Sequence, residues 1–162
     1  MAIEYRLAKP TDLKALLPLA EAFAHEQQSQ TPTDNQFTDR FMEYVHSGLA
    51  QTLAAPVACV MVAEAEVEGK QSVVGYAVGV LQGPPPIFED VPYIFLSDLY
   101  VLPEFRRQGV GTALIERVRG WGWVKGVYRV SSVAPTGSPV HSILGRLGFL
   151  PVQTMYYYKD PE

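Results

Sequence analysis

The apolar positions near the N-terminus predict one strand followed by two helices. Every second residue is apolar over residues 3–7, as in a strand. From residue 13 to residue 24 the apolar positions recur at steps of three and four, which predicts a helix, and the polar stretch 27–32 breaks this pattern. A second helical pattern opens with Thr33 and Gln36 at the spacing of a capping box.

The middle of the chain has the apolar runs that are typical of strands. Residues 58–63 and 72–81 are predicted to be two strands, with Glu68-Gly69-Lys70 as the hairpin turn between them. The sequence Gly83-Pro84-Pro85-Pro86 cannot continue a sheet, so it is predicted to form a stiff loop. A third strand follows this loop and ends at Pro103.

Glycines and prolines punctuate the last third of the chain. A basic, glycine-rich turn over residues 106–111 leads into a third helical pattern. Residues 128–134 predict another strand. A last helix opens at Ser138-Pro139, since proline suits the first helical position, and ends at Gly148. Residues 152–159 are predicted to form the last strand.

The predicted elements follow the order β-α-α-β-β-β-α-β-α-β, without an internal repeat, a linker or a low-complexity segment. This order predicts an α/β protein of the α+β type, in which helices cover both faces of a single mixed, mostly antiparallel sheet. At 162 residues the chain is long enough for one ordinary domain with its own core. We therefore expect residues 1–162 to form a single domain.

The composition excludes several classes of protein. Asp and Glu number 17 against 13 Lys and Arg, and the net charge is −4. An acidic chain without a long basic run is a poor nucleic-acid binder. No apolar run is long enough for a membrane span, and the single cysteine, Cys59, excludes an internal disulfide and fits a reducing cytoplasm. We therefore expect a cytoplasmic protein that binds neither nucleic acid nor membrane.

The glycine-rich turn is the strongest candidate for ligand binding. It lies at a helix start, where backbone N–H groups lack partners and carry partial positive charge. Its glycines allow a ligand to come close to the N–H groups of Gln108 through Thr112. Arg106 and Arg107 add full positive charges to this turn. The alternative for one of these arginines is that it faces solvent. Two familiar phosphate loops fit poorly, because Gly111 is not followed by Lys and because Leu114 replaces a required glycine.

An Arg-x-x-Gly-x-Gly pattern follows the third strand, at Arg106, Gly109 and Gly111. It closely resembles the acyl-coenzyme A signature of the GNAT superfamily of N-acetyltransferases. A second landmark of that family resembles Leu147-Gly148-Phe149, which follows a short helix. The strong resemblance covers residues 93–149, and upstream of it the order of elements agrees.

The resemblance implies the GNAT fold and acetyl-coenzyme A as co-substrate, with no metal. In the family, the main chain of the central strand pairs with the pantetheine arm, and the glycine turn holds the diphosphate. The implied coenzyme-binding residues are Leu99, Tyr100, Val101, Arg106, Arg107, Gln108, Gly109, Val110, Gly111 and Thr112. The three histidines are scattered and lack the spacing of metal ligands, which agrees with the expectation of no metal site.

Asp98 is the candidate general base. It lies inside an almost wholly apolar strand, where an aspartate is uncommon. Acyl transfer to an amine requires the amine to lose its proton, and many members of the family place a carboxylate at or near this point. The alternative is a structural aspartate that is paired with a partner such as an arginine. Burial would raise the pKa of Asp98, and a nearby positive charge would lower it.

The loop before the third strand carries Phe88, Glu89 and Asp90, close to where the acceptor groove of the family opens. Two loop acids are usually solvated. The alternative is a lip that attracts a cationic amine, and on that hypothesis these three residues are the predicted substrate-binding set.

The sequence departs from the family at the general acid. Many members have a tyrosine four residues before the glycine of the second landmark, and here that position holds Leu144. Three replacements remain to protonate the leaving thiolate. We rank water first, His141 second and one of the tyrosines at 156–158 third.

The expected function is N-acetyl transfer from acetyl-coenzyme A to a primary amine, by direct attack in a ternary complex, with a small-molecule or peptide amine as acceptor. One alternative is a catalytically silent acyl-coenzyme A-binding sensor or regulatory module. The missing tyrosine favours this alternative and Asp98 disfavours it. Another is a nucleotide-binding interaction domain, which the absent Gly-Lys-Ser/Thr disfavours. The sequence leaves the oligomeric state open, a homodimer included.

Overall fold

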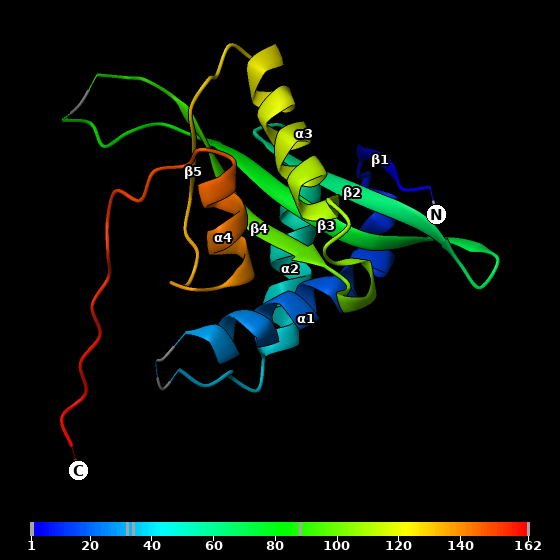
Figure 1. Cartoon of the computed structure of the whole chain (residues 1–162), viewed down its shortest axis with the longest axis horizontal. Coiled ribbons are helices and arrows are strands. Elements are labelled where there is room, and N and C mark those ends of the chain that lie inside the picture. Colours follow the sequence, from blue (N-terminus) through cyan, green and yellow to red (C-terminus); the bar gives the residue numbers. More distant parts are fainter. Residues whose placement is uncertain (1, 32, 34, 88, 162) are drawn as a thin grey trace.

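The computed structural model describes residues 2–31, 33, 35–87 and 89–161. Within these residues, five strands form one sheet in the order β1-β2-β3-β4-β5 (Figure 1). Neighbouring strands are antiparallel except for β4 and β5, which are parallel. The strands are β1 Glu4–Leu7, β2 Ala58–Val67, β3 Lys70–Gln82, β4 Tyr93–Val101 and β5 Val130–Ser132. The mixed, mostly antiparallel sheet predicted from the sequence is confirmed.

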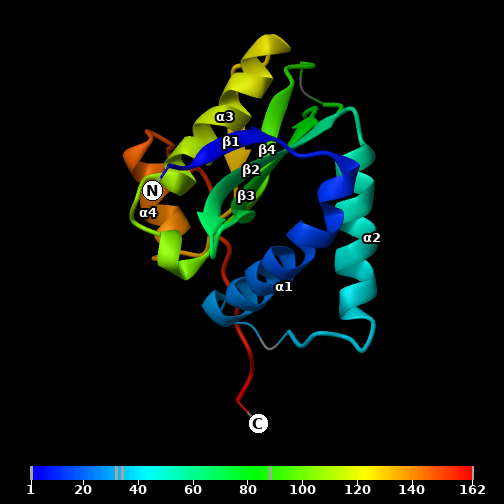
Figure 2. The same ribbon diagram turned by 90° about the vertical axis from the view of Figure 1, so that its right-hand side faces the viewer.

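Helices cover both faces of the sheet, as the sequence predicts (Figure 2). A short 3-10 turn, η1 (Pro10–Asp12), leads into α1, and a second one, η2 (Pro103–Phe105), follows β4. Helices α1 and α2 lie on one face, and α3 and α4 lie on the other. The helices are α1 Leu13–Gln30, α2 Phe41–Ala54, α3 Val110–Val124 and α4 Pro139–Arg146.

Each face of the sheet has its own apolar core. On the α1 side, Leu16 of the helix packs with Val62 and Tyr76 of the sheet, and all three are fully buried. On the α3 side, Leu114 and Val118 are buried against the sheet in the same way. Burial of an aliphatic side chain of this size stabilises the fold by about 1.5–3 kcal/mol. The two cores fix the helices on either side of β3 and β4.

Helix α3 packs directly on a glycine of β3, Gly79. A Cβ atom on Gly79 would lie 2.5 Å from Cγ1 of Val118 and 3.2 Å from Sγ of Cys59, which is buried. Real Cβ atoms do not approach other atoms so closely, so no larger residue fits this position without displacing the helix. This contact fixes α3 over the sheet, and with it the glycine turn at the start of α3.

The predicted hairpin between β2 and β3 is confirmed. Glu68 and Gly69 form its two-residue loop, and their φ angles are +50° and +76°. A loop in which both central residues have positive φ matches the twist of the flanking strands.

The boundaries of the first two helices differ from the prediction. Helix α1 continues through the polar stretch to Gln30, because polar residues end a helix only if they offer the backbone other partners. Helix α2 begins at Phe41, with Arg40 at its N-cap, so Thr33 and Gln36 do not form a capping box. Tertiary packing, rather than the local signals, decides where both helices begin and end.

The predicted last strand over residues 152–159 does not form. Beyond the turn at Gly148, this segment has no regular secondary structure and runs away from the sheet (Figure 1). Its alternating side chains are largely exposed, among them Val152 and Tyr156. Alternation predicts a strand only where an edge is ready to pair with it, and the neighbouring strand β5 has three residues.

Candidate active site

Strand β4 carries one extra residue, Ser97, at its centre. Val78 of β3 is opposite Asp98, whereas Gly79 is opposite Leu96, so Ser97 has no partner in this ladder. Side chains alternate along a strand, and one inserted residue therefore moves all following side chains to the other face of the sheet.

This bulge decides which face Asp98 occupies. Before the bulge, Ile94 and Leu96 pack in the core on the α3 side. After it, Tyr100 packs on the α1 side, and Asp98 lines a cavity on that side. Without the bulge, Asp98 would follow Leu96 into the apolar core. The bulge therefore brings a carboxylate to the face where α1 and α2 leave an opening.

The carboxylate of Asp98 has hydroxyl partners. Tyr76 Oη donates a hydrogen bond of 3.2 Å to Asp98 Oδ2, and the side chain of Ser97 also bonds to this carboxylate. Burial raises the pKa of Asp98 above its usual range, and the two hydrogen bonds partly offset that increase. Burial also raises the pKa of the Tyr76 phenol, so Tyr76 is a donor that keeps its proton. The predicted alternative, an aspartate paired with an arginine, does not describe this environment.

A cavity of about 580 Å³ opens between α1, α2 and the sheet, and Asp98 is part of its wall. Its size is that of a pocket for a small organic ligand. The described lining residues are Ala20, Phe23, Ala24, Gln27, Gln28, Thr31, Thr33, Asn35, Gln36, Phe37, Tyr44, Val45, Gly48, Leu49, Thr52, Val78, Val80, Ser97 and Asp98.

A second cavity, of only about 10 Å³, lies between β4 and the start of α4. It shares four of its lining residues with the large cavity: Phe23, Gln27, Ser97 and Asp98. Its other walls come from β4, from α4 and from the segment around β5. Asp98 therefore lies where the two cavities meet.

The small cavity exists because β4 and β5 separate. Their parallel pairing begins at Ile94 and ends where Leu96 meets Ser132. From Asp98 to Val101, β4 keeps its antiparallel partner β3 but has no partner on the β5 side. This open edge contains the residues predicted to pair with the pantetheine arm, Leu99, Tyr100 and Val101. The carbonyl of Val101 already accepts a hydrogen bond of 2.8 Å from Arg106 Nε.

The glycine-rich turn leads directly from this edge into α3. Arg107 and Gly109 have φ angles of +60° and +78°, so the backbone turns sharply before the helix. The first hydrogen bond into the helix runs from Ala113 N–H to Gly109 O. In the described part of the chain, the backbone N–H groups of Gln108 through Thr112 come before this first helical bond. They are therefore the groups that a helix start leaves without a partner within the helix.

The two arginines of the turn have different surroundings. Arg106 forms a two-pronged ion pair with Glu26 of α1, at 3.1 and 2.8 Å, and its guanidinium lies over the ring of Tyr100. Arg107 is exposed. The side chain of Arg106 thus ties the turn to α1, and the side chain of Arg107 faces solvent at the mouth of the turn.

The two described acids of the predicted acceptor loop, Glu89 and Asp90, do not line either cavity. Phe88 falls outside the described residues. Glu89 and Asp90 are exposed on the β3–β4 loop, which projects from one end of the sheet (Figure 1), and neither is among the described lining residues of the large cavity. Their exposure agrees with the alternative given above for this pair, that both acids are solvated residues of a loop.

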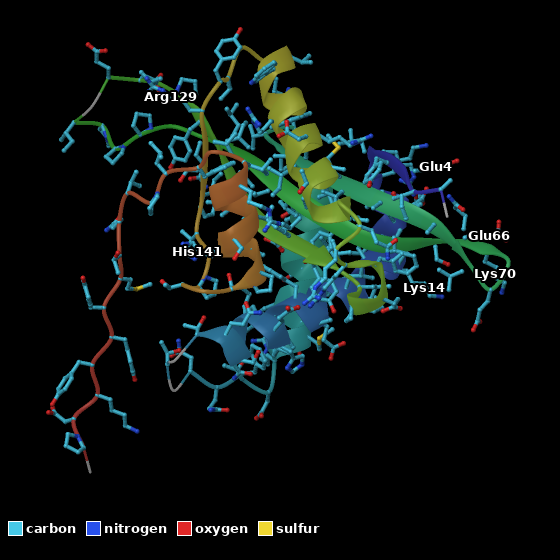
Figure 3. All side chains as sticks on the ribbon, viewed as in Figure 1. Glu4, Lys14, Glu66, Lys70, Arg129 and His141 are labelled. Carbon is cyan, nitrogen blue, oxygen red and sulfur yellow. The ribbon has the colours of Figure 1, made fainter. Side chains whose placement is uncertain are left out.

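The four side chains considered as general acid, His141 and the three tyrosines, are also away from the cavities. His141 is exposed on α4, where its Nδ1 accepts a hydrogen bond of 3.1 Å from Gly137 N–H (Figure 3). Tyr156, Tyr157 and Tyr158 lie in the C-terminal segment. Leu144, at the position of the family tyrosine, is buried in the core. In the described part of the chain, none of them lines either cavity.

The sequence analysis missed two residues of the site on α1. Phe23 and Gln27 line both cavities. The helical spacing of Ala20, Phe23, Ala24 and Gln27 carried the signal, because steps of three and four place these residues on one face. Gln27 was assigned to a polar break instead.

Two further classes of feature are missing from the residues that the structure describes. No group of three or more His, Cys, Asp and Glu side chains is arranged to hold a metal ion. None of the described helices combines the length and the apolar character needed to span a membrane.

Three features of the structure agree with the class of αβ proteins that the sequence resembles, the GNAT-type acetyltransferases. They are the order of the elements, the separation of β4 from β5 and the glycine turn. Residues 19–149 match the model of the Acetyltransferase (GNAT) family, and the chain belongs to this family.

Curated relatives match a shorter part of the chain. The aminoglycoside N(6')-acetyltransferase type 1 of Acinetobacter genomosp. 13 is 33% identical over 69 residues, which are 42% of this chain and 47% of that protein. The protein of the same name from Salmonella typhimurium is 33% identical over 69 residues, which are 42% and 48%. The matched part thus spans about half the length of these relatives.

Solved structures match nearly the whole chain. An aminoglycoside acetyltransferase, AAC(6')-Iy, in complex with the bisubstrate analogue CoA-S-monomethyl-acetylneamine has a TM-score of 0.72 at 21% identity, and 99% of each chain is covered. A predicted acetyltransferase from Clostridium acetobutylicum with acetyl-CoA has a TM-score of 0.75 at 14% identity, with 98% and 96% covered. At these identities the likeness shows the fold, and it confirms the GNAT fold predicted from the sequence.

Proposed function

We propose that this chain, as a single acyltransferase domain, is an N-acetyltransferase that transfers an acetyl group from acetyl-coenzyme A to a primary amine by direct attack in a ternary complex. The observation that carries the proposal is the position of Asp98. Its carboxylate lies where the large cavity, which has room for an acceptor, meets the small cavity beside the open edge of β4.

The residues around the glycine turn fit a coenzyme A molecule. The start of α3 offers backbone N–H groups and partial positive charge to a diphosphate, and Arg107 adds a full charge that has access to solvent. The open edge of β4 offers unpaired backbone groups to the amides of a pantetheine arm. The coenzyme supplies the activated acetyl group as a thioester.

Asp98 would accept the proton of the amine. A lysine-like amine has an ordinary pKa of about 10.4, so loss of its proton at pH 7 costs roughly 4.6 kcal/mol. A carboxylate with a raised pKa is a better proton acceptor than an exposed aspartate, since its affinity for the proton is closer to that of the amine. Tyr76 is a positioning residue that holds Oδ2 through its hydroxyl.

Water would protonate the leaving thiolate. A thiol has an ordinary pKa of about 8.5, so an unassisted thiolate at pH 7 lies only roughly 2 kcal/mol above the thiol. His141 and the tyrosines of the C-terminal segment lie outside both cavities, which supports the first place of water among the three replacements.

The acceptor in this proposal is a small-molecule or peptide amine. The curated relatives are named as aminoglycoside acetyltransferases, and the large cavity has the volume for an acceptor of small-molecule size.

A second candidate function is an acyl-coenzyme A-binding module without catalysis. The burial of Leu144 in the core favours it, because no side chain at that position can donate a proton to the site.

A panel of amines with acetyl-coenzyme A, read by the release of free thiol, separates the two functions. Amine-dependent thiol release supports the acetyltransferase. Tight coenzyme binding by calorimetry, without thiol release from any amine, would support the silent module.

A further inference from the structure

The described part of the large cavity's wall carries one charged side chain. Asp98 is the only carboxylate among its described lining residues. The rest of the described wall consists of aromatic and aliphatic side chains, amides and hydroxyls. Among them are the aromatic residues Phe23, Phe37 and Tyr44 and the amides Gln27 and Asn35.

Two acidic residues of the neighbouring helices, Glu26 and Glu43, form ion pairs with arginines outside the cavity. Glu26 is held by Arg106, at 2.8 Å. Glu43 is held by Arg40, also at 2.8 Å, and Glu21 lies 4.0 Å from His25. None of these three glutamates lines the cavity in the described part of the chain.

We infer that the acceptor is a primary amine with a single positive charge and a neutral, partly aromatic body, and not a polycation such as an aminoglycoside or a polyamine. The inference rests on the proposed function and names the substrate class of the same site. It differs from what the names of the curated relatives suggest.

The physical reason is the cost of an unpaired ammonium group. Removing an ammonium group from water is unfavourable unless a carboxylate or several acceptors replace the lost hydration. Asp98 serves the one amine that reacts. Against the described part of the wall, every further ammonium group of a polycation would meet amides, hydroxyls and aromatic rings, with no second carboxylate to balance its charge.

The aromatic side of the cavity is firmly built. Phe37 stacks on Phe41 with ring centroids 4.0 Å apart, and the His25 ring meets Phe37 edge-on at 4.9 Å. A pre-formed aromatic wall buries a ring or an aliphatic chain at little ordering cost. Gln27 and Asn35, which also line the cavity, provide hydrogen-bonding groups for the neutral polar parts of an acceptor.

The test compares kcat/KM for four acceptors at physiological salt: tyramine and glucosamine, which carry one amine each, and kanamycin A and spermidine, which carry several. We expect kcat/KM to be at least about tenfold higher for tyramine than for either polycation. Equal or higher values for kanamycin A or spermidine would overturn the inference and leave the proposed function standing. The absence of transfer to any amine would overturn the proposed function and the inference with it.

Charge-changing variants test the cause of the preference. Gln36→Glu adds a carboxylate to the cavity wall and should move the ratio of spermidine to tyramine toward spermidine by about two- to fivefold at low salt, the range of an exposed ion pair, and by less at high salt. Gln71→Glu adds the same charge on β3 outside the cavity and should leave the ratio unchanged. Equal effects of the two variants would contradict the inference.

Asp34 needs its own variant, because it lies in sequence between two lining residues and outside the described part of the chain. Asp34→Asn should leave the order of the four acceptors unchanged. The inference would be overturned if the wild type preferred spermidine to tyramine and Asp34→Asn did not. That result would assign a second carboxylate to the cavity.

Discussion

Tyr76 on β3 donates a hydrogen bond from its hydroxyl group to the carboxylate of Asp98 on β4, with 3.2 Å between the two oxygens. The strands pair so that Val78 is opposite Asp98, and Tyr76, two residues earlier on the same face, reaches across diagonally. Tyr76 is fully buried, whereas Asp98 opens into both cavities. A rigid donor behind a reactive carboxylate fixes its orientation and tunes its pKa.

Loss of the Tyr76 hydroxyl should shift the pH dependence of catalysis. The hydrogen bond stabilises the charged carboxylate and lowers the pKa of Asp98, so Tyr76→Phe should raise that pKa further. Asp98 accepts a proton only in its charged form. The acidic limb of the kcat/KM profile should therefore move to higher pH in the variant. The matched control is Tyr93→Phe, which removes a hydroxyl bonded to Gln82 outside the cavities. An acidic limb that stays in place in Tyr76→Phe would contradict the role of this bond.

Asp98→Asn should leave the protein equally or more stable at pH 7. The folded-state pKa of Asp98 is raised, so the folded protein binds this proton more tightly than the unfolded chain does. The stability of the wild type therefore falls as the pH rises from the ordinary pKa of an aspartate through the raised pKa of Asp98. Above that raised pKa, the charged carboxylate destabilises the fold. Melting temperatures at pH 7 and pH 4 check this. The advantage of the variant should shrink at pH 4, and a variant that is less stable at pH 7 would count against the raised pKa.

The two arginines of the glycine turn should respond differently to replacement by glutamine. Arg107→Gln should weaken coenzyme A binding by about two- to fivefold, the range of an exposed ion pair. Arg106→Gln should lower the free energy of unfolding by about 1–2 kcal/mol, because Arg106 holds Glu26 and the carbonyl of Val101. Calorimetric titration and urea unfolding measure the two effects. A larger loss of affinity in Arg106→Gln than in Arg107→Gln would reverse the assignment.

An ion-pair cluster far from the site should control acid stability. Arg6 lies between Asp12 and Glu64, and its guanidinium lowers the pKa of Asp12 to about 2. A carboxyl with a lowered folded-state pKa stabilises the fold above its ordinary pKa, and that contribution is lost as the pH falls toward 2. Asp12→Asn should cost about 1–2 kcal/mol at pH 7 and much less at pH 2.5. An equal cost at both pH values, measured by urea unfolding, would contradict the pairing.

The part of the fold that the sequence predicted best is the part with local, redundant signals. The hairpin at Glu68-Gly69, the turn at Gly109 and the helix that opens at Ser138 are set by neighbouring residues alone. In α4, Ser138 caps the helix by accepting a hydrogen bond of 3.2 Å from His141 N–H. Pro139 follows at the favoured position.

The part that the sequence did not predict depends on distant contacts. Helix α1 continues through the polar stretch to Gln30, and this extension brings Gln27 into the site. The bulge at Ser97 has no sequence signal of its own, since it appears only in the register between two strands. The C-terminal segment has the alternation of a strand and pairs with no edge of the sheet.

In the candidate site, too, local signals were predicted from the sequence and distant contacts were not. The resemblance to the family located Asp98 and the glycine turn. Charge alone did not separate Arg106 from Arg107, because both are basic and adjacent, and only the position of Glu26 on α1 distinguishes them. The acids of the β3–β4 loop were placed near the acceptor by sequence order, which carries no information about the direction in which a loop projects.

The most direct test of the central claim is the turnover of Asp98→Asn with acetyl-coenzyme A and a saturating amine, measured as the release of free thiol beside the wild type. Coenzyme affinity of both proteins is measured by calorimetry. A general base is typically worth about 10²–10⁴ in rate, so kcat should fall by that factor while the coenzyme dissociation constant changes by less than about twofold. Unchanged turnover in Asp98→Asn, with coenzyme affinity intact, would contradict the account and leave Asp98 with a structural role.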